Sequence, residues 1–185
     1  MSAIRLRGAT SGTTDVVAAA IAGDGVMTLP SGTGTLMKVE GGKVLQVVST
    51  FKNDTFSSSS TSFVDITGFT VSITPSSATS KVLVLVAFYS SATGANSPRY
   101  NLVRGATTIA QPSGGTSPST VQLNTASSTA SESASIIFLD SPATTSATTY
   151  KMQGRTDGNS FLINRRGDDA NETSVSSITV MEISA

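Results

Sequence analysis

The side chains of this sequence that are best suited to chemistry include three acidic residues near its C-terminal end. Asp168, Asp169 and Glu172 stand close together, and carboxylate oxygens are the ligands that hard cations such as Ca²⁺ prefer. Their spacing differs from that of an EF-hand loop, and Arg165 and Arg166 stand beside them as counter-charges. We therefore expect a solvated loop without a bound metal, in which these three carboxylates are the weak candidates for metal ligands.

The same loop contains Arg166-Gly167-Asp168, the tripeptide that integrins recognise. A match of three residues arises often by chance. We interpret this tripeptide as a turn.

Three further carboxylates, those of Glu132, Asp140 and Asp157, raise the question of glycoside hydrolysis. That reaction needs two carboxyl groups roughly 5–10 Å apart in a groove. Aromatic residues, which form platforms for sugars, make up only 5% of the chain. Because nothing in the sequence brings these carboxylates together, we assign no activity to them.

Histidine, cysteine and tryptophan are absent from the sequence. Without histidine or cysteine there is no Ser-His or Cys-His nucleophile pair and no ordinary zinc site. The absence of cysteine also removes any disulfide framework, so stability must come from packing and from association. We therefore expect a protein that is not an enzyme and that needs no cofactor.

Charge is sparse and balanced, with 12 basic and 12 acidic residues in 185. A neutral chain lacks the electrostatic basis for non-specific binding to nucleic acid. There is no signal-peptide pattern and no apolar stretch of about 18 residues, so we expect no membrane insertion and synthesis in a cytoplasm. A cluster of arginines would suit a phosphate-bearing glycan, but we favour ordinary surface charge and salt bridges between subunits for the seven arginines, which are Arg5, Arg7, Arg99, Arg104, Arg155, Arg165 and Arg166.

The elements that position these residues are expected to be strands. Serine and threonine make up close to a third of the chain, and threonine favours strands because its branched Cβ packs well on a pleated surface. No segment has a convincing helical period. Short strands bounded by turn residues, as in an antiparallel β-sandwich or jelly roll of about ten strands, are predicted at residues 44–51, 62–65, 70–73, 81–89, 100–104, 107–110, 120–123, 135–139, 149–153, 161–164 and 175–183.

The chain divides by composition into residues 1–41 and residues 42–185. The first part has two short extended runs, at residues 4–7 and 26–29, between Gly-rich turns. A segment of this size cannot bury a core of its own. We predict that it is an attachment or oligomerisation arm and that residues 42–185 form the sandwich. We interpret the Ser-, Thr- and Ala-rich stretches 112–120, 125–134 and 141–148 as solvated loops in preference to a variable contact surface.

Two of the predicted strands carry further information. Residues 177–180 alternate polar with apolar, and the phase breaks at residues 181–183, which predicts a bulge or strand end. Residues 82–88 are continuously apolar, which is typical of a strand buried on both faces. A small sandwich covers only one face, so we predict a subunit interface, unless the N-terminal arm covers the strand instead. The interface residues that we assign are Val82, Val84, Val86 and Phe88. The tyrosines Tyr89, Tyr100 and Tyr150 are expected in the core or at an interface.

Several segments resemble virion structural proteins of tailed bacteriophages, especially marine phages and cyanophages. The central block is residues 61–68 (TSFVDITG) and 71–84 (VSITPSSATSKVLV). The ending, residues 176–183 (SSITVMEI), resembles the close of the same proteins. Residues 4–8 (IRLRG) and 26–34 (VMTLPSGTG) are similar to segments that precede such domains in phage tail fibres.

This resemblance implies a β-sandwich domain, commonly trimeric, that acts as a fibre tip, a receptor-binding knob or a capsid decoration. Tail fibres usually carry a long N-terminal adaptor and shaft, whereas this chain has about forty residues there. We therefore expect a homotrimeric short tail fibre or fibre tip on the outer surface of the virion. It would attach to a host cell-surface glycan and contact other virion proteins through residues 1–41. The alternatives are a capsid decoration (cement) protein and, more remotely, a capsule depolymerase.

Overall fold

The computed structural model describes residues 3–7, 13–17 and 42–185. The chain separates into two compact units, Met1–Lys38 and Val39–Ala185. In the first unit, β1 (Ala3–Arg7) and β2 (Thr13–Val17) form an antiparallel hairpin, which includes the strand predicted at residues 4–7. The extended run predicted at residues 26–29 lies outside the described residues. The role of residues 1–41 as an arm stays a prediction.

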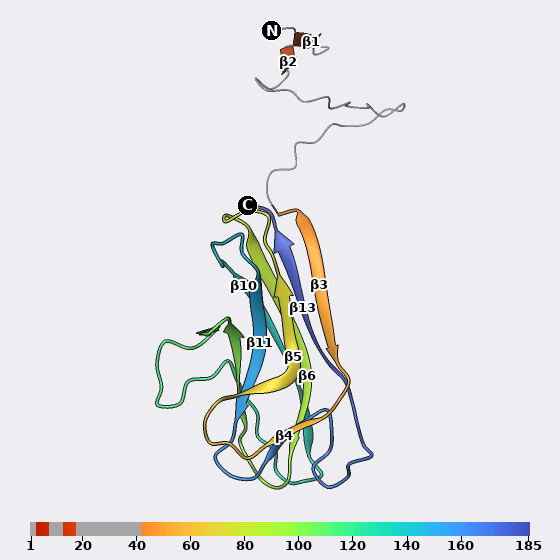
Figure 1. Cartoon of the computed structure of the whole chain (residues 1–185), viewed down its shortest axis with the longest axis vertical. Coiled ribbons are helices and arrows are strands. Elements are labelled where there is room, and N and C mark those ends of the chain that lie inside the picture. Colours follow the sequence, from red (N-terminus) through yellow and green to blue (C-terminus); the bar gives the residue numbers. More distant parts are fainter. Residues whose placement is uncertain (1–2, 8–12, 18–41) are drawn as a thin grey trace. The chain divides into compact units, whose positions relative to one another are not determined.

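The second unit is an antiparallel β-sandwich, as the sequence predicts (Figure 1). All of its strand pairs are antiparallel, and residues 42–185 contain no helix. Accordingly, no helix in the described part of the chain has the length and apolar character needed to cross a membrane. The six-stranded sheet consists of β3 (Val44–Lys52), β13 (Ser176–Ile183), β6 (Lys81–Ala92), β12 (Phe161–Ile163), β4 (Phe56–Ser58) and β10 (Ser131–Asp140). The five-stranded sheet consists of β5 (Val64–Ile73), β11 (Thr148–Arg155), β7 (Arg99–Arg104), β8 (Thr107–Ile109) and β9 (Val121–Gln122).

The order of the strands is that of a jelly roll. In the six-stranded sheet β3, β13, β6 and β10 lie side by side, and in the other sheet the order is β5, β11, β7, β8. Apart from β7 and β8, consecutive members of this set of eight lie in opposite sheets. This is the eight-stranded, double-sheet arrangement of a jelly roll.

Aromatic side chains from both sheets form a continuous row through the core. Phe88 of β6 meets Tyr100 of β7 with ring centroids 4.9 Å apart, and Tyr100 meets Phe161 of β12 at 5.6 Å, both edge to face. Phe69 and Phe56 extend this row at its two ends. Rings in this geometry stabilise a core by about 0.5–1.5 kcal/mol per pair beyond their burial. This row therefore holds the two sheets together.

The predicted strands are found with some changes of extent. The strands predicted at residues 62–65 and 70–73 are one strand, β5, whose pairing with β11 shifts register between Lys151 and Gln153. At this irregularity Gly68 has φ +75°, and the buried Lys52 ammonium donates to the carbonyl oxygen of Thr67 at 2.7 Å. Strand β10 begins at Ser131, within a stretch predicted as loop, and β4 is not predicted at all.

The predicted break near the end of β13 is a β-bulge. Glu182 pairs with Gln46, but the next residue, Ile183, pairs with Val44, so β3 carries one extra residue there. The Glu182 side chain is fully buried and accepts hydrogen bonds from Gln46 Nε2 at 2.7 Å and from Ser76 N at 2.8 Å and Oγ at 2.6 Å. Burial alone would raise the pKa of Glu182, but these hydrogen bonds outweigh it and lower the pKa to about 2.

Candidate interaction surface

The assignment of β6 side chains to a subunit interface is corrected by the structure. The four residues assigned to the interface lie in the core of the sandwich, with exposed fractions of 0 to 3%; they are Val82, Val84, Val86 and Phe88. A strand alternates its side chains between two faces, and in a continuously apolar run the sequence does not say which alternate set faces inward. The set that points away from the core is Leu83, Leu85, Ala87 and Tyr89.

In the middle of the sheet these outward side chains belong to an area without charged residues, and Lys81, the outward residue of β6 before Leu83, lies at its border and bonds to Ser141. The strand register aligns three rows of four residues across β3, β13, β6 and β10. We call these twelve positions the uncharged face: Val47, Met181, Leu83 and Leu139 in the first row, Ser49, Thr179, Leu85 and Ile137 in the second, and Phe51, Ser177, Ala87 and Ser135 in the third.

The uncharged face exposes large apolar side chains to solvent. Ile137 is 73% exposed, Phe51 71%, Leu139 55% and Val47 54%. A few exposed apolar residues are normal on any protein, but a contiguous patch of them marks an interaction site. The uncharged face is therefore the best candidate for a functional surface in the described part of the chain.

An open hollow of about 600 Å³ adjoins the third row of the uncharged face. Its lining is mostly small side chains and apolar atoms, from Ala87, Phe88, Tyr89, Ser133, Ala134, Ser135, Ser174 and Val175. Val175, at its rim, is 61% exposed. A hollow of this shape and lining is suited to receive an apolar side chain from another molecule.

The outer face of the five-stranded sheet is polar, in contrast to the uncharged face. Asp65 of β5 accepts hydrogen bonds from Lys151 Nζ and Gln153 Nε2 of β11, each at 2.7 Å. These bonds, the one from Lys151 first, lower the pKa of Asp65. The hydroxyls of Ser72 and Thr149 bond to each other at 2.8 Å on the same sheet. This outer face can remain in water, because its groups are polar and already have partners.

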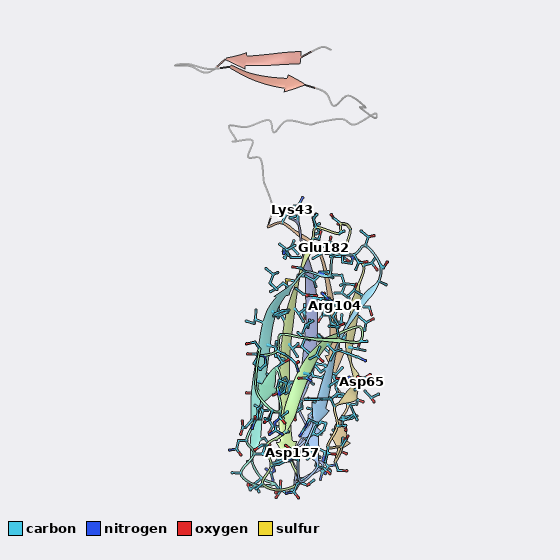
Figure 2. All side chains as sticks on the ribbon, turned by 90° about the vertical axis from the view of Figure 1, so that its left-hand side faces the viewer. Lys43, Asp65, Arg104, Asp157 and Glu182 are labelled. Carbon is cyan, nitrogen blue, oxygen red and sulfur yellow. The ribbon has the colours of Figure 1, made fainter. Side chains whose placement is uncertain are left out.

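An arginine pair marks the end of the sandwich opposite Glu182 (Figure 2). Arg99 and Arg155 both bond to the carboxylate of Asp157, and these bonds, that of Arg99 first, lower the pKa of Asp157. Two guanidinium groups share one carboxylate here, so the group of three has an excess positive charge. Arg104 pairs with Asp140, and Arg166 with Asp168 and Glu172. These ion pairs lie within one chain, and salt bridges between subunits stay a prediction.

The three weak metal candidates do not converge on a common point. Arg166 Nε bonds to Asp168 at 2.6 Å and Arg166 Nη1 lies 3.3 Å from Glu172. The Asp169 carboxylate instead accepts from the backbone N–H of Asn171 at 2.8 Å. Within residues 3–7, 13–17 and 42–185 no group of three acidic residues is placed to hold a metal ion. The Arg-Gly-Asp tripeptide is accordingly closed on itself by an ion pair between its own arginine and aspartate.

Asp140 is far from the other two carboxylates considered for glycoside hydrolysis. Glu132 and Asp140 are eight residues apart on β10, a separation of about 27 Å along an extended strand. Arg104, the partner of Asp140, and Asp157 lie at clearly different heights of the sandwich in Figure 2. Asp140 therefore forms no acid–base pair across a groove with either of the other two carboxylates.

Asp140 has a structural role that the sequence does not reveal. It is 6% exposed, and both of its carboxylate oxygens accept from Arg104 Nη1 at 2.8 Å. The Tyr150 hydroxyl donates to the same carboxylate at 2.7 Å. Because Asp140 lies on β10 and both partners lie in the other sheet, this group connects the two layers. Tyr150 and Tyr100 are core residues, as expected, whereas Tyr89 lines the hollow.

No protein-family model matches this chain, and no curated protein matches it. The geometry described above and the resemblance noted in the sequence are therefore the grounds for a functional proposal. Of the described surfaces, the uncharged face is the one that exposes large apolar side chains, which an isolated sandwich would keep away from water.

Proposed function

We propose that this protein is a non-enzymatic structural protein of a tailed bacteriophage particle, displayed on the outside of the virion as a homotrimeric short tail fibre or fibre tip. The observation that carries the proposal is a jelly-roll sandwich with one satisfied polar face and one exposed uncharged face. Jelly rolls recur in viral capsid domains and in lectins. The phage-like segments at residues 61–68, 71–84 and 176–183 agree with this assignment.

The proposed activity is binding alone. Several copies held in one appendage would each make weak contacts with a host cell-surface glycan, and their combination gives an avidity that a single copy lacks. The arginine pair Arg99 and Arg155 with Asp157 is one place where an anionic glycan would find a charge-assisted donor. Residues 1–41 would join the protein to neighbouring virion proteins.

The alternative is a capsid decoration protein that stabilises the head. A flat sheet face without charge also suits contact with a broad capsid lattice, and residues 1–41 would then bridge adjacent capsid subunits. The remote alternative, a capsule depolymerase, gains no support from Asp140, which is too far from Glu132 and from Asp157 (Figure 2) for the required pair.

The test is immunogold electron microscopy on intact particles of the phage that encodes the chain. Antibody raised against the full chain should label the tail end of the particle, and particles from a deletion of the gene serve as the unlabelled control. Label spread over the head would replace the fibre by the decoration protein. Absence of label from wild-type particles would contradict both virion assignments.

A further inference from the structure

We infer that the uncharged face is the surface on which a second copy of this chain packs. The inference deepens the proposed function and rests on its homo-oligomeric part alone. It assigns the contact to β3, β13, β6 and β10. On β6 the contact residues are the outward side chains, which alternate with the core residues Val82, Val84, Val86 and Phe88.

The first argument is the contrast between the two outer faces of the sandwich. The polar outer face of the five-stranded sheet can stay in water, whereas the uncharged face leaves Ile137 and Phe51 more than two-thirds exposed. The same sheet ends at β3 and β10, each of which pairs with one neighbour only within the described residues. A long edge strand with exposed apolar side chains invites association unless something covers it. We therefore expect another surface to pack against this face and to shield its apolar side chains from water.

The second argument identifies the cover as a copy of the same chain. The polar groups of the uncharged face are hydroxyls, as in the Ser49–Thr179 pair at 2.8 Å. A hydroxyl both donates and accepts hydrogen bonds, so it is complementary to its own kind, whereas a carboxylate or an ammonium is not. The chain also has no formal net charge, so two copies approach without long-range repulsion. A strongly charged partner protein would find no counter-charge among the twelve positions, with Lys81 as the cation at their border.

The third argument is the shape of the face at its third row. Phe51 projects at one end of that row and is 71% exposed, while Ala87 and Ser135 at the other end border the 600 Å³ hollow. The protruding ring of one copy is apolar, and so is most of the lining of the hollow that would receive it in the next copy. Repetition of such a head-to-tail contact closes a ring only when the rotation between copies is a whole fraction of a turn, and a homotrimer requires one-third of a turn.

The size of the face sets the expected strength of the contact. One outward position of a sheet covers about 33 Å² of its plane, so twelve positions span about 400 Å² per copy before relief and rim are added. Stable complexes bury about 800 Å² per partner. The twelve positions alone therefore give about half of a standard interface, and we expect weak, reversible association with a dissociation constant in the micromolar range or weaker.

The experiment is a sedimentation-velocity concentration series on the full chain with two matched variants. Ile137→Glu places a carboxylate on the uncharged face, and Ser72→Glu places one at an exposed outward position on β5 of the other sheet. Wild type and Ser72→Glu should associate alike, while Ile137→Glu should raise the dissociation constant at least about 100-fold, because the charge must be buried unpaired. Wild type that stays monomeric at all concentrations would overturn the inference. So would an Ile137→Glu variant that associates as well as wild type, or equal weakening by both substitutions.

A second measurement locates the contact without introducing a charge. The chain has no cysteine, so Ile137→Cys or Ser72→Cys carries a spin label at a single site. Dipolar broadening between copies should appear for the label at 137 and not at 72, and the reverse pattern would contradict the assignment. Both experiments use purified protein, so their failure is separate from the failure of the virion assignment, which immunogold labelling decides.

Discussion

Asn164 is a buried residue whose side chain connects distant parts of the six-stranded sheet. We expect its replacement to be among the most destabilising single substitutions. It follows β12 with φ +59° and is completely buried. Its amide donates to the carbonyl oxygens of Lys52 at 2.7 Å and Asp54 at 3.1 Å. Its carbonyl oxygen accepts from the Ser176 hydroxyl at 2.6 Å. One side chain thus connects the end of β3, the turn after it and the start of β13.

The change Asn164→Ala removes these three hydrogen bonds. Each bond contributes about 1 kcal/mol net, and the buried partners left without a bond add a desolvation penalty. Alanine also tolerates a left-handed backbone less well than asparagine, by about 1 kcal/mol. We expect the free energy of unfolding to fall by about 3–5 kcal/mol. Glycine at this position relieves the backbone but not the lost bonds, so Asn164→Gly should cost about 1 kcal/mol less than Asn164→Ala.

The assay is urea unfolding followed by far-UV circular dichroism, because the chain has no tryptophan to report on its fold. The urea dependence of all three proteins should have the same slope, so that midpoints convert to stability differences. A loss of less than about 1 kcal/mol for Asn164→Ala, or a glycine variant less stable than the alanine variant, would refute the reasoning.

Three further predictions concern the pH dependence of stability, the close packing around Gly167 and the side chains of β6 that face the core. The pKa of Glu182 is lowered from 4.5 to about 2 in the folded protein, so its contribution to stability is present above pH 4.5 and is lost as the pH falls toward 2. The urea midpoint of Glu182→Gln should therefore fall less over that range than that of wild type, and parallel curves would contradict this role. A Cβ at Gly167 would overlap a backbone carbonyl oxygen, whereas one at Gly114 meets open space. Thermal unfolding should show that Gly167→Ala is destabilised by about 2 kcal/mol or more and that Gly114→Ala is nearly unchanged. Equal melting temperatures for the two variants would contradict the close packing of Gly167 against the carbonyl oxygen of Ala92. Val84 is in the core and Leu85 faces outward, so Val84→Ala should reduce the stability of the dissociated chain by about 2 kcal/mol and Leu85→Ala by much less, as urea unfolding at low protein concentration would measure. A larger loss of stability for Leu85→Ala than for Val84→Ala would contradict this assignment of the inward and outward side chains of β6.

Much of the fold follows from local patterns in the sequence. Alternation at residues 70–73 and 177–180 marks strands with one buried face, and the break at residues 181–183 marks the bulge beside Glu182. The extent of β10 does not follow, because Ser131–Ala134 has little strand character of its own and is extended by pairing with Ser91–Phe88 of β6. Pairing between segments distant in sequence overrides local propensity there.

The sequence predicts that β6 has a second apolar face, but it does not identify the side chains that form the outer one. The apolar run 82–88 correctly indicates that more than one face of β6 is apolar. Which face is outward depends on the register of β6 with β13 and β10, and a shift of one residue exchanges the two sets. The Asp140, Arg104 and Tyr150 group has no signal in the sequence either, because its members come from three strands that meet only in the folded chain.

Quantitative mass spectrometry of purified virions tests our proposal that this chain is a structural component of a phage particle. We expect peptides of this chain in particles that have been banded and washed, at a fixed ratio to known tail proteins and in a multiple of three copies. Copies as numerous as the major capsid protein would favour the decoration protein instead. Absence of the chain from purified particles, with its presence in the infected-cell lysate, would contradict the claim.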